Sequence, residues 1–138
     1  QAMNTGHDGS MTTGHANSPR DFLSRLEYMC MSGGGDMPLS AIRPQIASAV
    51  DIIVQIGRVR INGKKARKTL GIVEVLNGFT EDGDYRLLPL FESKFKGADK
   101  HEICPTGKHP TFIDELVEDF DFDIHDLDEP KVKPEPKV

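Results

Sequence analysis

The chain has 138 residues, which is the size of one domain, and its 37% hydrophobic and 28% charged residues are typical of a globular protein with some unstructured polar sequence. No apolar run reaches the roughly 20 residues of a membrane-spanning helix, and no signal peptide is expected because the N-terminus lacks a basic region followed by an apolar core. The net charge of −5 is unevenly distributed: residues 58–68 contain six basic and no acidic residues, whereas residues 113–129 contain nine acidic residues and neither Lys nor Arg.

The first residues are expected to contain a helix end and a short strand. "QAMNTG" is typical of a helix that stops at Gly6, since glycine just beyond a helix end is a common stop signal, so the domain is expected to begin before Gln1. The stretch "DGSMTTGHA" is rich in small residues that strands tolerate, and we predict a short buried strand over Met11–Thr13.

A first helix is predicted over "NSPRDFLSRLEYMCM". Ser18 is a suitable N-cap, Pro19 suits the first helical position, and Asp21 completes an S-x-x-D capping box. "SGGGD" ends the helix. One face is predicted to be buried; its apolar residues are Phe22, Leu23, Leu26, Met29 and Cys30.

A second helix is predicted over residues 38–49. Pro44 interrupts it, because proline lacks a backbone donor and disfavours helix at Arg43, so the helix either begins late with Ser40 as its cap or is kinked. Its expected apolar face consists of Leu39, Ile42, Ile46 and Val50.

Hairpin-linked strands follow the helices. "DIIVQIGRV" is predicted as a strand, and its apolar run Ile52–Val54 favours burial on both faces. Asn62-Gly63 is a hairpin turn signal, and Asp82-Gly83 marks a turn before a strand over Tyr85–Phe91. Helices combined with these strands predict an α/β fold with an antiparallel rim.

The pattern weakens beyond Phe91. "KFKGADKHE" is predicted as a polar loop, and a short helix is predicted from Pro110 onward. "DEPKVKPEPKV" has three prolines in eleven residues and is expected to be disordered. The expected organisation is a main domain over residues 1–92, a loop and short helix over 93–125, and a disordered tail over 126–138.

The candidate site is "TGHDGSMTTGHANSPRD", which carries His7 and His15. An H-x7-H spacing matches no metal-ligand motif, and Ser10 is not in the G-x-S-x-G context of a nucleophile. Phosphate contact fits better, because glycines allow close backbone approach while hydroxyls and imidazole can donate hydrogen bonds. A structural turn with surface histidines is the alternative. The residues that favour a phosphate are Gly6, Gly9, Gly14, Ser10, Thr12 and Thr13.

The remaining motifs mainly argue against particular kinds of site. No G-x-x-x-x-G-K-[ST] phosphate loop occurs, so the chain cannot cradle a nucleotide triphosphate by that route. The basic segment 58–68 has no interleaved aromatic residues, which favours a solvated or subunit-facing hairpin over a nucleic-acid interface. Cys30 and Cys104 lack metal-binding spacing and are expected to be reduced thiols.

Taken together, "TGHDGSMTTGHANSPRDFLSRLE", "AIRPQIASAVDIIVQIGR", "GIVEVLNG" and "LPLFE" resemble the C-terminal part of the type II/type IV secretion ATPases, and especially the CpaF-like motors of tight-adherence pili. The resemblance covers about residues 1–92, and "PTGKHPTFIDEL" more loosely resembles the family's closing segment. The hairpin after Arg58 is longer and more basic than the family pattern.

The resemblance implies part of a RecA-like P-loop ATPase domain that assembles as a homo-hexamer. Such a motor hydrolyses ATP with Mg²⁺ in the cytoplasm, peripheral on the inner membrane, and works with inner-membrane platform proteins of a secretion or pilus system; no nucleic-acid partner is expected. The family's Walker A and Walker B motifs lie upstream of this chain, which is therefore not expected to be active alone.

The resemblance also implies roles for individual residues. The family's histidine box, which senses the nucleotide, corresponds to His7, Gly9, Ser10, Thr13 and His15. Arg20 and Arg58 are candidates for contacts between subunits. Packing and intersubunit contact are expected for Gln45, Asp51 and Glu74.

A different reading stays open from the residues alone. The chain is then a non-catalytic interaction module that binds a partner through its basic hairpin and acidic tail. A histidine-based metallohydrolase is a third, weaker reading. If the chain is part of a larger sheet, apolar edges around Ile52–Val54 and Val73–Leu76 should be exposed.

Overall fold

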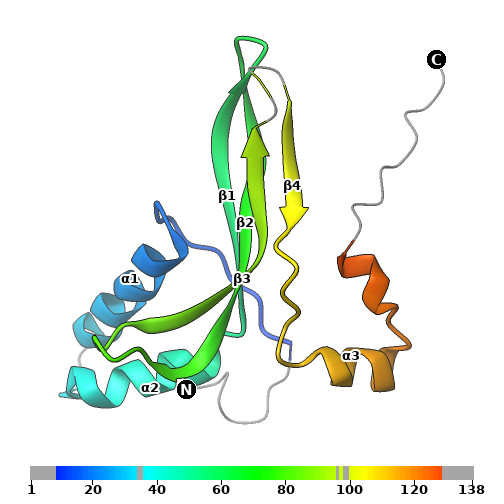
Figure 1. Ribbon diagram of the computed structural model, residues 1–138. Helices are drawn as coiled ribbons and strands as arrows, with labels where there is room; N and C mark the ends of the chain where they lie inside the picture. Colours follow the sequence, from blue (N-terminus) through cyan, green and yellow to red (C-terminus); the bar gives the residue numbers. More distant parts are fainter. Residues whose placement is uncertain (1–8, 34–35, 96, 98–99, 129–138) are drawn as a thin grey trace. The chain divides into compact units, whose positions relative to one another are not determined.

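A computed structural model describes residues 9–33, 36–95, 97 and 100–128 (Figure 1). The elements in chain order are α1 (Pro19–Ser32), α2 (Leu39–Ala49), β1 (Ile52–Ile61), β2 (Lys64–Phe79), β3 (Tyr85–Phe95), β4 (His101–Pro105), α3 (Ile113–Phe120) and the short 3-10 helix η2 (Ile124–Leu127). The four strands form one sheet in the order β1-β2-β3-β4. The predicted α/β class with hairpin-linked antiparallel strands is confirmed, and the RecA-like assignment stays a prediction.

The chain divides into two compact units. The first comprises Gln1–Gln55 and Val73–Leu88, and the second comprises Ile56–Ile72 and Pro89–Val138. The predicted helix end at Gly6 and the prolines of the predicted tail lie outside the described residues, whereas residues 126–128 belong to η2 and its C-cap.

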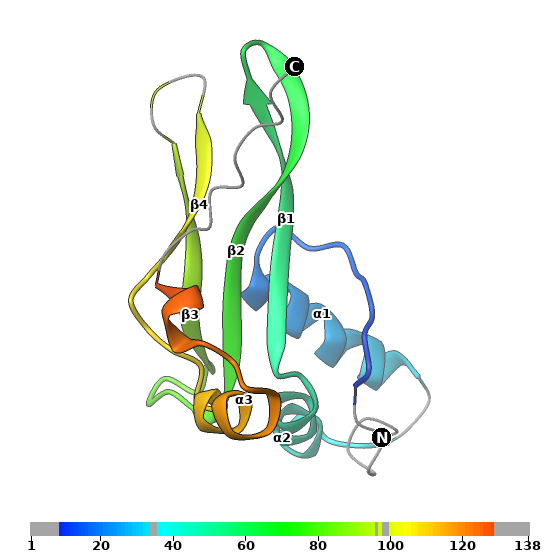
Figure 2. The same ribbon diagram turned by 90° about the vertical axis from the view of Figure 1, so that its right-hand side faces the viewer.

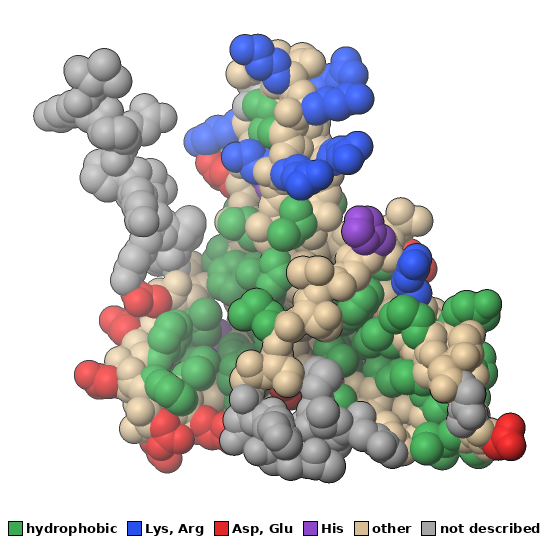
Figure 3. All heavy atoms as spheres, turned by 180° about the vertical axis from the view of Figure 1, so that it is seen from behind, with side chains coloured by type: hydrophobic (Ala, Val, Ile, Leu, Met, Phe, Trp, Pro, Cys, Tyr) green, Lys and Arg blue, Asp and Glu red, His purple; other side chains and the backbone are tan. Residues whose placement is uncertain are grey.

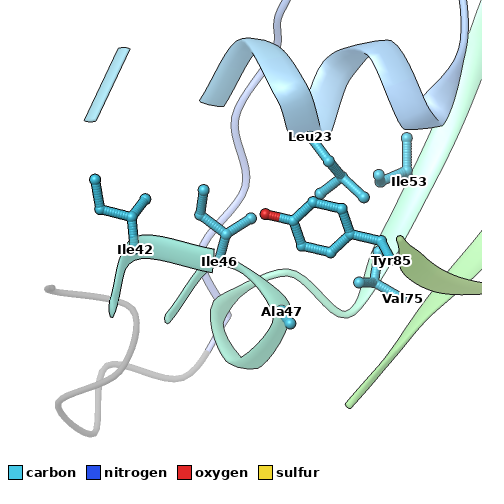
Figure 4. Close-up of a cluster of buried hydrophobic side chains, with 7 residues drawn as sticks. All are labelled: Leu23, Ile42, Ile46, Ala47, Ile53, Val75 and Tyr85. Carbon is cyan, nitrogen blue, oxygen red and sulfur yellow. The ribbon is translucent and has the colours of Figure 1, made fainter. Parts of the chain in front are cut away.

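The core of the first unit lies between α1, α2 and the adjoining ends of the strands. Tyr85 at the start of β3 is 2% exposed and extends into the cluster (Figure 4). Each aliphatic side chain buried in this way contributes about 1.5–3 kcal/mol to folding. The cluster consists of Leu23, Ile42, Ile46, Ala47, Ile53, Val75 and Tyr85.

Helix α1 begins as its capping signals predict. The Asp21 N–H donates to the Ser18 side-chain oxygen at 3.1 Å, and Pro19 is the first helical residue. The predicted apolar face is only half right, because Leu23 is buried whereas Met29 and Cys30 are exposed. In the described part of the chain, packing covers the first turns of α1 and leaves its last turn in solvent.

Helix α2 runs from Leu39 to Ala49 with Pro38 as N-cap, so the predicted helix is confirmed and, of the two alternatives for Pro44, a late start with Ser40 as cap is wrong. Pro44 lies inside the helix and removes the N–H that would bond the Ser40 carbonyl. Pro44 and Ser40 are both exposed, so this side of the helix faces solvent. Of the expected apolar face, Ile42 and Ile46 are buried.

Strand β1 is confirmed, but the predicted burial on both faces is wrong. Ile53 is 8% exposed, whereas its neighbour Val54 is 50% exposed, because α1 and α2 pack against one face of the strand. The expected exposure around Ile52–Val54 is therefore seen. The same expectation fails for Val73–Leu76, where Val75 belongs to the core.

Both predicted turns are confirmed. Asn62 and Gly63 have φ of 50° and 74°, which is the left-handed pair that a two-residue hairpin turn needs. In the second turn, Gly83 has φ 79° and its N–H donates to the Thr80 carbonyl at 2.8 Å.

Two loop and strand predictions are wrong. Residues Met11–Thr13 form no strand, and Met11 is 97% exposed, because no sheet edge pairs with this segment. The predicted loop "KFKGADKHE" is wrong at its two ends, where residues 94–95 belong to β3 and residues 101–102 to β4, and in this antiparallel pair Phe95 lies opposite His101. The polar side chains misled the prediction because a strand in an exposed hairpin needs few apolar residues.

The second unit also contains the predicted C-terminal helix. Helix α3 runs from Ile113 to Phe120, and its C-cap Asp121 adopts the left-handed conformation. The segment before α3 is joined to β3 by Thr106, whose hydroxyl donates to the Pro89 carbonyl at 2.7 Å. None of the helices in the described residues is long and apolar enough to cross a membrane.

Candidate functional site

The candidate site is the segment of residues 9–18 that leads into α1. Its predicted site residues Gly9, Ser10, Thr13 and His15 are all exposed, and Gly9 has φ 82°. His7, the other predicted histidine, lies outside the described residues. The segment therefore presents hydroxyl and imidazole groups to solvent next to the first turn of a helix.

Three contacts anchor this segment to the first unit. A Cβ atom at Gly14 would overlap the Phe22 ring, so the backbone lies closer to this side chain of α1 than a residue with a Cβ allows unless the ring moves. The Gln55 side chain donates to the Ala16 carbonyl at 3.3 Å and joins the segment to β1. Ser18 then caps α1. Because Gly14 and Ala16 are both held by these contacts, His15 is exposed between two fixed positions.

The electrostatic surroundings come from the helix and from one ion pair. The macrodipole of α1 favours an anion near the start of the helix, whereas the Asp21 carboxylate in its first turn opposes one. Arg20 forms an ion pair with Asp84, and both side chains are about half exposed. Arg20, a candidate for contact between subunits, thus has a partner within its own chain.

The segment fits one wall of a phosphate site. Residues 9–18 contain no carboxylate and no lysine, so they offer hydrogen-bond donors but neither the ligands of Mg²⁺ nor a cationic side chain other than protonated His15. The described residues contain no group of three or more His, Cys, Asp or Glu that could hold a metal. Catalysis therefore requires groups from outside this segment.

A charged cluster beside the core was missed by sequence reasoning. Arg43 of α2 pairs with Glu27 of α1, and the Tyr85 hydroxyl is buried beside them without a hydrogen bond of ordinary geometry. Burial and the adjacent Glu27 carboxylate raise the pKa of Tyr85 well above its usual value, and the Arg43 guanidinium opposes this shift. The three residues of the cluster come from two helices and a strand that are far apart in the sequence. No sequence motif relates their positions, so the cluster could not have been predicted from the sequence.

The remaining predicted residues are scattered over the fold. Gln45 lies on α2, where its side-chain amide is 3.5 Å from the Met37 sulfur, and the Asp51 carbonyl accepts from the Val75 N–H at 2.8 Å. Glu74 is buried, and Arg58 is exposed on β1. The thiols of Cys30, exposed, and Cys104, half-buried, are both free. None of these positions adds a group to the segment of residues 9–18.

Comparison with known proteins places the candidate site inside a matched region. Residues 1–86 match the family model described as Type II/IV secretion system protein. This match covers 62% of the 138 residues, including α1, α2, β1, β2 and the segment before α1.

Three relatives illustrate the similarity. The type IV secretion system protein VirB11 of Bartonella quintana is 42% identical over 62 residues, which are 41% of this chain and 17% of the relative. PtlH, a type IV secretion system protein of Bordetella pertussis, is 36% identical over 69 residues, or 49% of this chain and 20% of the relative. A protein of Mycobacterium tuberculosis whose name assigns it to conjugal transfer is 36% identical over 64 residues, or 46% of this chain and 18% of the relative. The chain thus spans about a fifth of the length of these relatives.

Proposed function

The chain belongs to the type II/IV secretion system protein family, and from this membership we propose that it forms the C-terminal portion of an ATP-hydrolysing motor that powers type II/IV secretion or pilus assembly. The observation that carries the proposal is the family match over residues 1–86, which contains the exposed, anchored segment before α1. The relatives named as type IV secretion system proteins support the same system.

In this proposal the segment of residues 9–18 senses the nucleotide. His15 donates a hydrogen bond from its imidazole to a phosphate oxygen, and the hydroxyls of Ser10 and Thr13 supply further donors. The N-terminal end of α1 favours the same negative charge. Loss of a phosphate removes charge from this surface and changes the hydrogen bonds that it makes.

The contacts that attach the segment to the rest of the first unit can transmit a change at the phosphate to other elements. Gly14 lies against Phe22 of α1, and Ala16 is hydrogen-bonded to Gln55 of β1. A shift at His15 is therefore transmitted to a helix and to a strand rather than absorbed by a loose loop. His7 is proposed to act with His15.

The rest of the motor lies outside this chain in the proposal. ATP and Mg²⁺ are held mainly by a phosphate loop and an acidic residue upstream, and the chain assembles as a homo-hexamer, with Arg20 and Arg58 as candidates for subunit contacts. The motor acts in the cytoplasm at the inner membrane, with platform proteins of a secretion or pilus system as partners. No nucleic acid takes part.

The test is the substitution His15→Ala in the full-length protein. We expect ATP turnover to fall about ten-fold or more, because a donor aimed at a charged phosphate is lost. The matched control is His125→Ala, since His125 is exposed on η2 outside the matched region. Unchanged turnover and unchanged secretion in the His15 variant would contradict the sensing role, and absence of ATP hydrolysis in the unmodified full-length protein would contradict the motor.

A second candidate function is a non-catalytic interaction module. The separation of six basic residues in 58–68 from nine acidic residues in 113–129 favours it. Nucleotide binding by the full-length protein separates the two candidates, because a pure interaction module has no need to bind ATP.

A further inference from the structure

One face of the β1–β2 hairpin carries four basic side chains. Arg58 and Arg60 are two residues apart on β1 and therefore share a face, and both are exposed. The two-residue turn Asn62-Gly63 places Lys65 opposite Arg60, and Arg67 follows on the same face of β2. We call this surface, Arg58, Arg60, Lys65 and Arg67, the basic face.

The basic face has no counter-charge of its own. Among the residues that the structure describes, none of its four side chains forms an ion pair, whereas Lys100 in the neighbouring hairpin pairs with Glu102. Like charges opposite each other across two strands are destabilising. The arrangement therefore costs folding stability and gains nothing within the described chain.

Helix α3 carries an acidic surface, whose charge is opposite to that of the basic face. Its carboxylates are Asp114, Glu115, Glu118 and Asp119. Val117 and Phe120, one turn apart, are also exposed, at 43% and 74%. The amphipathic helix thus presents apolar side chains bordered by acids.

The two surfaces match in spacing as well as in charge. Alternate residues on a strand are about 7 Å apart, and residues four apart on a helix are about 6 Å apart. Arg58 and Arg60 can therefore lie beside Asp114 and Glu118. Ile56 shares the face of Arg58 on β1 and is 59% exposed, so it offers an apolar contact to Val117, which lies next to Asp114 around the helix.

The basic face cannot meet α3 of its own chain. Both belong to the second unit, and within it the β1–β2 turn and α3 lie at opposite ends in two perpendicular views (Figures 1 and 2). In Figure 3, which colours side chains by type, the Lys and Arg side chains gather at the hairpin end of the molecule. The contact requires another molecule, and a second copy brings the complementary surface with it.

We propose that the basic face of one copy docks on the acidic face of α3 in a neighbouring copy. The two surfaces differ, so the contact is heterologous and joins copies head to tail into a ring or an open chain. The proposal rests on the proposed homo-hexamer, to which it adds a pair of contacting surfaces, and it depends on charge complementarity and apolar contact and not on ATP hydrolysis. Nucleic acid fits the hairpin less well, because residues 58–68 contain no aromatic side chain for stacking.

The test is charge exchange in the full-length protein. One variant carries Arg58→Glu, Arg60→Glu, Lys65→Glu and Arg67→Glu, and the other carries Asp114→Lys, Glu115→Lys, Glu118→Lys and Asp119→Lys. Sedimentation velocity measures association of each variant, of their mixture and of the unmodified protein in about 50 mM and about 500 mM salt. Arg25→Glu with Arg86→Glu, two exposed positions in the first unit, is the control for reversal of charge elsewhere.

We expect each variant alone to associate at least about ten-fold more weakly than the unmodified protein and the mixture to regain association, because every reversed face then meets its complement. Salt should weaken association of the unmodified protein and of the mixture alike. Restoration in the mixture also shows that the variants fold. Failure of the mixture to regain association, or equal association of all variants, overturns the proposal. Binding of the hairpin to an anionic vesicle or to DNA, with self-association unchanged by reversal, also overturns it. Because the readout is association, failure here leaves the His15 test of ATP hydrolysis untouched.

Discussion

Arg43 of α2 donates from Nε to the Glu27 carboxylate of α1 at 2.9 Å, so one hydrogen-bonded ion pair joins the two helices. The same guanidinium lies over two aromatic rings, 4.8 Å from the centre of Phe79 and 5.0 Å from that of Tyr85. Arg43 thus connects α2 to α1 and to the strand ends that bear these rings. The pair is largely removed from solvent, with side chains 25% and 16% exposed.

The substitution Arg43→Met should lower the free energy of unfolding by about 2–4 kcal/mol. It leaves the Glu27 carboxylate partly buried without its partner and removes the cation from both rings. Urea unfolding followed by circular dichroism measures the change. The control is Arg20→Met, which breaks the exposed pair with Asp84 and should cost less than about 1 kcal/mol. Equal losses in the two variants would show that the Glu27 pair stabilises no more than a surface pair.

Tyr85 should make the first unit sensitive to alkali. Burial beside Glu27 raises the pKa of Tyr85 above the ordinary value of about 10, so the folded state holds the phenolic proton more tightly than the unfolded state. The stabilisation is fully present below pH about 10 and is lost as the pH rises toward the folded-state pKa.

Replacing Tyr85 with Phe should remove this alkaline loss and change stability at neutral pH by no more than about 1 kcal/mol, since the hydroxyl makes no hydrogen bond of ordinary geometry. Thermal unfolding between pH 7 and about pH 11 checks the expectation, and Tyr28→Phe at an exposed position is the control. A Tyr85 variant that retains the same alkaline transition would assign the transition to another group.

The cap of α1 should contribute measurably to its stability. Ser18→Ala removes the acceptor of the Asp21 N–H and should cost about 1 kcal/mol. Ser24→Ala, at an exposed position inside the same helix, should be neutral or slightly stabilising because alanine has the higher helix propensity. Chemical denaturation of both variants gives the comparison, and a loss at Ser24 as large as at Ser18 would exclude a specific role for the cap.

Gly14→Ala should loosen the segment that carries His15. The added methyl group overlaps the Phe22 ring, and overpacking of this kind costs about 1–3 kcal/mol. Gly33→Ala is the control, since its Cβ would meet only ordinary contacts and its φ is −74°. Thermal unfolding gives the stability difference, and hydrogen exchange of the His15 and Ala16 amides reports the loosening. If exchange is unchanged, the approach of Gly14 to Phe22 does not hold the segment.

Elements governed by local chemistry could be predicted from the sequence. The Ser18 cap needs only an acceptor three residues before a helical N–H, and the Asn62-Gly63 turn needs only two residues that tolerate positive φ. Both signals lie within a few residues of the structure that they determine.

Features that depend on distant partners could not be predicted in the same way. Met11–Thr13 has the composition of a strand but no sheet edge to pair with, and the burial of Ile52–Val54 depends on which face the helices cover. Strand β4 becomes a strand because β3 lies beside it. The candidate site shows the same division: the resemblance to the family's histidine box pointed to His15, whereas the attachment of its segment through Gln55, far along the chain, could be seen only in the fold.

The turn at Asn62-Gly63 restricts how the length of this hairpin can vary. Side chains alternate between faces at every residue, so a single inserted residue between Arg60 and the turn would move Arg58 and Arg60 to the face of Val59 and Ile61 or force a bulge. One residue added to each strand lengthens the hairpin and keeps both arginines where they are. The hairpin therefore tolerates an insertion or deletion when both strands change by the same number of residues. A change of one residue in one strand alone moves the positive charge to the other face or forces a bulge.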